Sequence, residues 1–312
     1  MRRSEHIAVV GAGLMGHGIA QVFAAKGNEV TLTDTDPGVL AQAETNIRAN
    51  LFFLAAHGIG TADDIEPAVR NIRSTMDLGD AVRGARFVVE AISENMALKQ
   101  GLIQAIEGFV APTTVLATNT SAISITEIAA KAKRKERIVG TLFWNPPYLI
   151  PLVEVVPGKH TSQEVVDYAF DLLKTVGKHP VKIKRDVPGF VGNRLQHALW
   201  REAISIVDQG IADASTVDEV IKNGFGIRLP VLAPLETADM VGLDLTLQIH
   251  DYILRHIDRS VASSPMLRKK VDRGELGFKA GKGFYEWNRE SIDQCRKRLV
   301  EHLVRWNREH DE

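Results

Sequence analysis

The sequence predicts an α/β protein in which a doubly wound, largely parallel sheet precedes an all-helical domain. Three observations support this prediction: short β-rich runs alternate with helical patterns, a glycine-rich turn joins the first run to the first helix, and helical spacing alone continues after residue 187. A chain of 312 residues fits two domains. We place the sheet domain at residues 1–187 and the helical domain at residues 188–312.

The first strand–helix–strand unit is complete by residue 34. Residues 6–10 (HIAVV) form a β-rich run, residues 14–26 have a helical pattern, and residues 29–34 form a second β-rich run that ends in an acid. Further strand candidates are residues 72–77, 86–92, 113–118, 137–142, 151–156 and 180–184, and helical patterns between the candidates include residues 38–58, 95–110 and 162–176. Alternation of this kind predicts parallel strands covered by helices.

The second half of the chain carries helical spacing without a convincing strand. Helices are expected over residues 190–210, 215–222, 235–257 and 265–273. Residues 276–285 form a glycine-punctuated loop, and a charged helix over residues 289–309 follows.

Composition narrows the function classes. Hydrophobic residues make up 45% and charged residues 25%, which excludes disordered and fibrous proteins. The net charge of −1 gives no general attraction to nucleic acid or to an anionic membrane, and the basic cluster at residues 131–135 is typical of a solvated helix end. No apolar stretch approaches the roughly 18 residues that span a bilayer. We therefore expect a small-molecule partner.

The single cysteine, Cys295, excludes an intrachain disulfide and a cysteine-based zinc site. The short apolar run after the N-terminal arginines is too short for the core of a signal peptide. These features fit a cytoplasmic protein with no metal site.

Gly11-Ala12-Gly13-Leu14-Met15-Gly16 matches the GxGxxG dinucleotide-binding fingerprint. The motif follows a strand candidate and opens a helix, which strengthens an otherwise weak pattern. In a Rossmann-type fold the first glycine permits the turn, the second lets the backbone approach the pyrophosphate, and the third allows close helix packing. The helix N-terminus then offers N–H groups to the phosphates. FAD binding and a glycine turn without a ligand are the alternatives.

Asp34 selects among the dinucleotides. It lies 18 residues after Gly16, at the end of the second strand candidate. Its carboxylate can accept hydrogen bonds from the adenosine ribose, whereas a 2′-phosphate would be repelled. NAD is therefore favoured over NADP.

Several further stretches match one family in order and spacing over essentially the whole chain. They are residues 88–95 (VVEAISEN) with Lys99, 118–121 (TNTS), 143–147 (FWNPP), 152–155 (LVEV), 188–194 (PGFVGNR) and 281–285 (GKGFY). With these motifs the chain resembles the L-3-hydroxyacyl-CoA dehydrogenase family. The resemblance implies a Rossmann domain, a helical C-terminal domain that forms a homodimer, and NAD-linked oxidation of a secondary alcohol at C3 of an acyl group.

The resemblance also implies cofactor and substrate contacts. The residues that would contact the cofactor beyond the fingerprint are Glu94, Lys99, Asn119, Ser121, Asn145 and, from the C-terminal domain, Lys279. Ser121 and Asn193 would in addition contact the substrate oxygen.

The family's catalytic pair is a histidine three residues before the Asn-Pro and a glutamate nine residues after that asparagine. The histidine accepts the hydroxyl proton, and the glutamate orients the imidazole and stabilises its charged form. Glu154 occupies the glutamate position, but Leu142 occupies the histidine position. A leucine cannot exchange a proton, so we expect the activity of this sequence to be strongly impaired.

Three explanations fit Leu142: a deliberate inactivating substitution, a natural change of chemistry or of the proton-handling group, and a protein that binds NAD without turnover. No replacement base is obvious, because His179 lies in a Gly-Lys-His-Pro turn outside the predicted site. His197, four residues after Asn193, more often packs in a core or interface at such a position.

The sequence favours a free 3-hydroxy or 3-keto carboxylate over an acyl-CoA substrate. In this family the helix after the second strand supplies lysines for the nucleotide end of CoA, whereas here residues 38–58 contain Arg48 and the pair Phe52-Phe53. Residues 145–154 are similar to members that act on free hydroxy acids, such as L-gulonate 3-dehydrogenase with its relative λ-crystallin, and carnitine dehydrogenase. Arg201 and Arg228 are candidate carboxylate ligands or solvated surface residues, and Trp144 is either a pocket wall or a structural residue.

Overall fold

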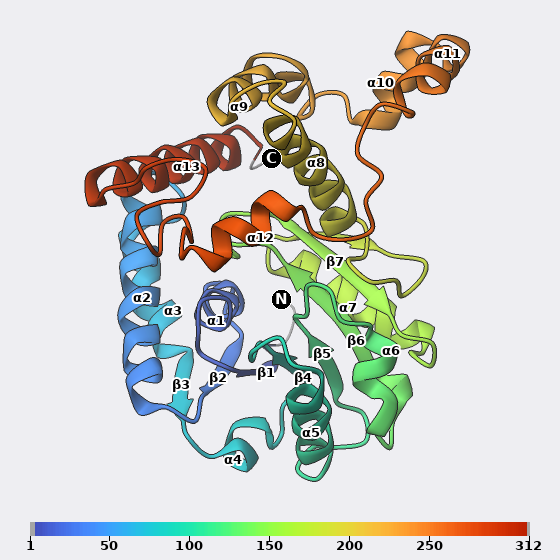
Figure 1. Cartoon of the computed structure of the whole chain (residues 1–312). Coiled ribbons are helices and arrows are strands. Elements are labelled where there is room, and N and C mark those ends of the chain that lie inside the picture. Colours follow the sequence, from blue (N-terminus) through green and yellow to red (C-terminus); the bar gives the residue numbers. More distant parts are fainter. Residues whose placement is uncertain (1–3, 311–312) are drawn as a thin grey trace. The chain divides into compact units, whose positions relative to one another are not determined.

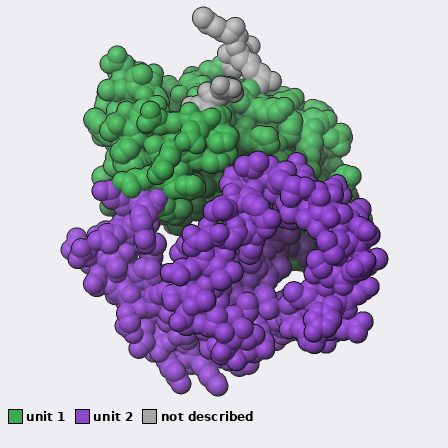
Figure 2. Space-filling model, turned by 90° about the horizontal axis from the view of Figure 1, so that it is seen from above, with its two compact units in different colours: residues 1–193, 299–312 green, residues 194–298 purple. Residues whose placement is uncertain are grey.

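A computed structural model describes residues 4–310, which divide into two compact units (Figure 2). Unit 1 contains residues up to Asn193 and, after a long excursion, the segment that begins at Leu299. Unit 2 contains Arg194–Arg298. The last fourteen residues of the chain are thus assigned to the same unit as the sheet.

Unit 1 is built on one eight-stranded sheet with the strand order β3-β2-β1-β4-β5-β6-β7-β8 (Figure 1). The strands are β1 His6–Val10, β2 Glu29–Thr33, β3 Ile72–Thr75, β4 Phe87–Glu90, β5 Val115–Thr118, β6 Ile138–Phe143, β7 Leu152–Pro157 and β8 His179–Lys182. Every neighbouring pair is parallel except β6–β7, which is antiparallel. The predicted α/β fold class is confirmed.

Helices cover both faces of this sheet. Alternate residues of β1 separate to the two faces: Val9 belongs to one hydrophobic cluster and Val10 to the other. The first cluster includes Phe23 of α1 and Ile47 of α2, and the second includes Ile103 of α5. The helices of unit 1 are α1 Gly16–Ala24, α2 Pro37–Ala56, α3 Ile65–Arg70, α4 Leu78–Val82, α5 Met96–Glu107, α6 Ile125–Ile128 and α7 Gln163–Thr175, with 3-10 turns η1 Ala62–Asp64, η2 Ala129–Lys131 and η3 Lys135–Arg137.

The strand order reverses direction at β1. This strand lies between β2 and β4, and its last residue, Val10, is in register with Thr33 of β2 and Glu90 of β4. In open α/β sheets, ligands bind beyond the carboxyl ends of the strands at such a switch point. The glycine fingerprint follows β1 directly, at this position.

Unit 2 is helical, and one predicted helix is wrong. The elements from residue 192 onward are α8 Gly192–Asp208, α9 Ala214–Asn223, the 3-10 turn η4 Phe225–Arg228, α10 Pro234–Val241, α11 Leu243–Ile253, α12 Pro265–Asp272 and α13 Arg289–Glu309, of which α8 begins and α13 ends in unit 1. The single helix expected over 235–257 is two, because Gly242 has φ +102°, a conformation outside the helical range. Residues 276–285 form a loop that is closed by a bridge between Gly277 and Lys282.

The end of α13 contributes to the core of unit 1. Val304 is 4% exposed and packs with Leu54 of α2 and with Leu149, which lies between β6 and β7. Asn307 donates a hydrogen bond from Nδ2 to the carbonyl oxygen of Leu149 at 2.8 Å. The C-terminal helix therefore links α2 to the segment that follows β6.

Within residues 4–310, no helix is both long and apolar enough to cross a membrane.

Candidate active site

The glycines at both ends of the fingerprint are required by the packing. Gly11 has φ +100°, and a Cβ placed there would lie 2.6 Å from the carbonyl oxygen of Ala91. A Cβ on Gly16 would lie 1.7 Å from the carbonyl oxygen of Gly11. Real Cβ atoms do not approach backbone oxygens this closely, so larger residues would force the turn and α1 apart.

Gly13 differs from these two glycines because, apart from its two chain neighbours, no atom of the described residues lies within 4 Å of a Cβ placed on it. The neighbouring Leu14 side chain is 69% exposed, and the N-cap residue of α1, Met15, makes no side-chain cap hydrogen bond. A helix N-terminus of this kind offers N–H groups and a positive dipole end to an anion. The turn fits a dinucleotide diphosphate, since a side chain at Gly13 would fill the space the backbone leaves open.

Asp34 is held against the fingerprint. Its Oδ2 atom accepts a hydrogen bond from the backbone N–H of Ala12 at 2.8 Å, and its Oδ1 atom accepts one from Asp36 at 3.2 Å. A carboxylate has further lone pairs, so these bonds leave acceptor capacity for ribose hydroxyls. The half-buried position at the end of β2 fits the ribose role that the sequence predicts.

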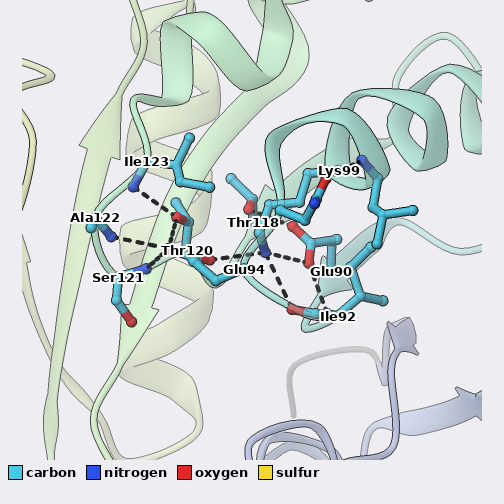
Figure 3. A network of polar contacts seen from close by, with 11 residues as sticks. Glu90, Ile92, Glu94, Lys99, Thr118, Thr120, Ser121, Ala122 and Ile123 are labelled. Carbon is cyan, nitrogen blue, oxygen red and sulfur yellow. Dashed lines mark hydrogen bonds and ion pairs between the residues drawn. The ribbon is translucent and has the colours of Figure 1, made fainter. Parts of the chain in front are cut away.

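A buried ionic network lies beside the turn (Figure 3). Lys99 of α5 is 0% exposed, and its Nζ lies 2.7 Å from Oε1 of Glu90 and 3.4 Å from Oε2 of Glu94. Glu90, at the end of β4, is also fully buried. It accepts further hydrogen bonds from the backbone N–H of Ile92 at 2.8 Å and the hydroxyl of Thr118 at 2.5 Å. Lys99 is therefore a buried partner of two carboxylates.

Glu94 connects this network to the segment after β5. Its Oε1 atom accepts hydrogen bonds from the hydroxyl of Thr120 and from the backbone N–H groups of Ser121 and Ala122, at 2.6, 3.0 and 3.1 Å. Burial raises the pKa of Glu94, but the bond from Thr120, the charge of Lys99 and the two backbone bonds outweigh it and lower that pKa below its usual value. Glu94 stays ionised and fixes the backbone that carries Ser121.

The structure brings Ser121 and Asn193 together. Asn193 donates from its Nδ2 atom to the carbonyl oxygen of Ser121 at 2.9 Å, although the two lie 72 residues apart in sequence. Asn119, two residues before Ser121, accepts a hydrogen bond from the backbone N–H of Phe143 at 2.9 Å. The end of β5 is thereby tied to the end of β6, where the Leu142 position lies.

Leu142 and Glu154 are cross-strand partners in the antiparallel β6–β7 pair. Leu142 is 4% exposed and packs in the second hydrophobic cluster. Oε1 of Glu154 accepts hydrogen bonds from the backbone N–H groups of Val191 and Gly192, at 2.9 and 3.2 Å. Oε2 of Glu154 is buried and has no hydrogen-bond partner among the described residues. The carboxylate thus keeps one oxygen without a donor.

Trp144 lies beside this glutamate. A Cβ on Gly192 would be 2.4 Å from the Trp144 ring and 3.1 Å from Oε2 of Glu154. The Trp144 Nε1 atom is also buried without a partner among residues 4–310. Asn145, the next residue, has an exposed side chain.

The remaining candidates lie elsewhere. His179 is the exposed first residue of β8. In unit 2, Lys279 is exposed in the loop before α13, and His197 stacks edge-on against Trp200 with ring centroids 5.0 Å apart. Arg201 reaches the carbonyl oxygen of Ser260 at 3.4 Å, and Arg228 is exposed. None of them is placed beside Glu154 by a contact within unit 1.

Glu90 is the residue that sequence reasoning missed. It stands inside the quoted motif at residues 88–95, yet no role followed from its position there. An ionisable residue in an otherwise apolar strand candidate was the available signal, because a buried charge needs a partner.

Comparisons with known proteins agree over both halves of the chain. The family model of the 3-hydroxyacyl-CoA dehydrogenase NAD-binding domain matches residues 6–187, and that of the C-terminal domain of the same family matches residues 189–287. Human mitochondrial hydroxyacyl-coenzyme A dehydrogenase is 37% identical over 290 residues, which cover 91% of each chain.

A dehydrogenase named for a pyridine carboxylate substrate is similar over a longer span. The 5-formyl-3-hydroxy-2-methylpyridine 4-carboxylate 5-dehydrogenase of Mesorhizobium japonicum is 33% identical over 300 residues, 96% of each chain. A crystal structure of an enzyme of that activity, described as an NAD+-dependent dismutase, superposes with a TM-score of 0.91 at 32% identity and covers 98% of both chains. (S)-3-hydroxybutyryl-CoA dehydrogenase from Ralstonia eutropha gives 0.77 at 32% identity, covering 92% of this chain and 100% of its own.

The glycine geometry predicts opposite failures for two single-methyl substitutions. Gly16→Ala should lower the melting temperature sharply, because its Cβ collides with backbone. Gly13→Ala should leave the melting temperature close to that of the parent but weaken NADH binding at least tenfold, since its Cβ enters only the ligand's space. Thermal unfolding and calorimetric titration with NADH measure the two effects. Equal NADH affinity in Gly13→Ala and the parent would contradict the diphosphate site.

Proposed function

Because the chain belongs to the NAD-dependent 3-hydroxyacyl-CoA dehydrogenase family, we propose that it is a dehydrogenase of 3-hydroxy carboxylates that is disabled at Leu142. The reaction interconverts the 3-hydroxy and 3-keto compounds by hydride transfer. The single observation that carries this proposal is Oε2 of Glu154, a buried carboxylate oxygen without a donor, on the strand position opposite Leu142.

The site residues divide the chemistry among them. The nicotinamide ring, when bound, supplies the hydride acceptor. Ser121 and Asn193, which are joined by a hydrogen bond, would bind the substrate oxygen. The hydroxyl proton needs an acceptor at position 142, where an imidazole could donate its other N–H to Oε2 of Glu154. Leu142 provides neither group, so the proton has no acceptor at that position.

A free carboxylate fits this chain better than a CoA thioester. Arg48, the one arginine or lysine in residues 38–58, is engaged in an ion pair with Glu66. The end of α2 is covered by the C-terminal helix through Leu54 and Val304. The substrate in the name of the similar Mesorhizobium japonicum dehydrogenase is a carboxylate. An acyl-CoA substrate is the alternative, and it would need cations that α2 does not supply.

Restoring histidine tests the proposal. Leu142→His should raise NADH formation by about 10² to 10⁴-fold over the parent chain, the usual contribution of a positioned general base. The assay follows NADH absorbance with NAD and a panel of free 3-hydroxy acids and their CoA thioesters. Leu142→Met, which changes the side chain without adding a base, is the matched control and should stay at the parent rate.

The outcomes separate the three explanations. Turnover only in Leu142→His identifies a disabled dehydrogenase, and its preferred substrate decides between free acid and thioester. Appreciable turnover by the parent chain would indicate altered chemistry. Binding of NADH in both proteins with turnover in neither would identify a protein that binds NAD without catalysis.

Glu154 should matter only when a histidine is present. Glu154→Gln is expected to change the low rate of the parent chain less than threefold, because there is no imidazole to orient. The same substitution in Leu142→His should remove most of the restored rate, since residues that act as a unit are non-additive. A rate assay of the four combinations tests this. A large loss in the parent background would give Glu154 an independent role.

We further infer that unit 2 forms a homodimer. Within its described helices, α8, α10, α11 and α12 contain no buried residue. Large apolar side chains on α10 and α11 are exposed, including Leu235 at 82%, Leu247 at 61% and Tyr252 at 73%. Large exposed apolar side chains gathered on two helices favour an association site, and closed two-fold dimers are the commonest solution.

An acidic residue in this surface should break the dimer. Leu247→Asp is expected to shift the sedimentation mass from two chains to one at micromolar concentration, because it places an unpaired charge in the interface. Gln248→Asp adds the same charge at the adjacent exposed position and is expected to be milder. A monomeric parent chain, or a dimeric Leu247→Asp variant, would contradict this assignment.

A further inference from the structure

The segment of residues 145–151, here called the 145–151 loop, joins β6 to β7 and begins at Asn145. Asn145 is exposed. The rest of the loop is less accessible: Pro147 is buried and Leu149 is 1% exposed. The loop is therefore packed against the protein although its first residue is exposed.

Lys178 holds two carbonyl groups of this loop. Its Nζ atom donates to the backbone oxygens of Pro147 and, at 3.0 Å, of Ile150. No carboxylate of the described chain forms an ion pair with it. Burial lowers the pKa of the Lys178 ammonium to about 8. Lys178 therefore joins two carbonyl groups of the loop through one side chain.

Asn307 holds a third carbonyl group from the opposite end of the chain. Its Nδ2 atom donates to the oxygen of Leu149 at 2.8 Å and to Leu303 of its own helix at 2.7 Å. The Leu149 side chain packs against Leu54 and Val304. The C-terminal helix therefore fixes the loop through one hydrogen bond and one apolar anchor.

The carbonyl groups of the loop explain why Lys178 and Asn307 are needed as hydrogen-bond donors. The oxygen of Pro146 accepts from the N–H groups of Leu149 and Ile150, at 3.0 and 2.9 Å, and the oxygen of Pro151 accepts from His179 at 2.9 Å. The oxygens of residues 147, 149 and 150 have Lys178 and Asn307 as their partners. Buried carbonyls are costly when unpaired, so these two side chains complete the loop.

The anchored loop touches the fingerprint helix. A Cβ on Gly18 would lie 2.5 Å from Cγ of Pro147 and 3.4 Å from the Tyr148 ring. Gly18 lies two residues after Gly16, in the first turn of α1. Shifting the loop would therefore move Asn145 relative to the dinucleotide-binding turn.

We propose that Lys178 and Asn307 are positioning residues, which hold the 145–151 loop so that Asn145 faces the nicotinamide half of the bound dinucleotide. The inference rests on the cofactor role proposed for Asn145. It makes the last turns of α13, which lie beyond the matched family domains at residue 287, part of the scaffold of the site.

Two ligands separate positioning from general stability. NADH carries the nicotinamide half, and ADP-ribose carries only the half bound by the fingerprint and Asp34. Lys178→Met and Asn307→Ala should each weaken NADH binding about tenfold in calorimetric titration and change ADP-ribose binding less than twofold. Lys178→Arg, which keeps a charged donor, should recover part of the loss. Lys184→Met and His302→Ala alter nearby exposed residues and should bind both ligands as the parent does.

Hydrogen–deuterium exchange of the loop gives a readout that needs no ligand. Peptides covering residues 145–151 should exchange faster in Lys178→Met and Asn307→Ala than in the two control variants. Unchanged exchange in both variants overturns the anchoring role. Faster exchange with equal losses for NADH and ADP-ribose, or with no loss for either, overturns the link to Asn145. If Leu142→His shows no turnover in the activity panel, the proposed dehydrogenase is refuted instead. Ligand binding and hydrogen–deuterium exchange then still test the positioning role.

Discussion

The ion pair between Glu90 and Lys99 is the interaction on which the rest of the site depends. Both side chains are fully buried, and an unpaired charge in that position would be costly. The pair is tolerated because Glu90 also accepts hydrogen bonds from Ile92 and Thr118, so its carboxylate is well satisfied. These bonds join the carboxyl ends of β4 and β5 to α5. Breaking one partner would strand a charge in the interior, at a cost of about 3–5 kcal/mol.

From this pair the order of the site extends outward, one hydrogen bond at a time. Lys99 reaches Glu94, whose other oxygen fixes the backbone of Ser121 and Ala122. Ser121 in turn receives the side chain of Asn193, the last residue of unit 1 before α8 continues into unit 2. The backbone of Ser121 and the side chain of Asn193 are thus linked, through Glu94, to the buried pair of Lys99 and Glu90. Rigid support of this kind is what keeps functional groups in place.

Local pattern was sufficient to predict the eight strands and the fingerprint, but long-range partners were not predictable. Runs of β-branched residues, as in residues 6–10, predict the strands, and the glycines predict the turn. The break at Gly242 was missed because apolar spacing continues on both sides of it, and a positive φ leaves no trace in periodicity. The charged helix at 289–309 was predicted, yet nothing local indicates that its end packs on α2 and Leu149. The role of Lys178 likewise emerges only when the carbonyl groups of a distant loop are counted.

The two halves of the site lie on different elements, which bears on Leu142. The dinucleotide half is made of backbone, a helix end and Asp34, whereas the proton-transfer half lies on β6 and β7. Leucine satisfies the packing of the second hydrophobic cluster, so the fold accepts a residue that offers no proton acceptor. In the proposed dehydrogenase, both oxygens of Glu154 have a role. The N–H groups of Val191 and Gly192 need only its Oε1 atom, and its second buried oxygen costs about 1–3 kcal/mol while it lacks a donor. An apolar pocket has no use for that oxygen, but a cross-strand imidazole at position 142 does.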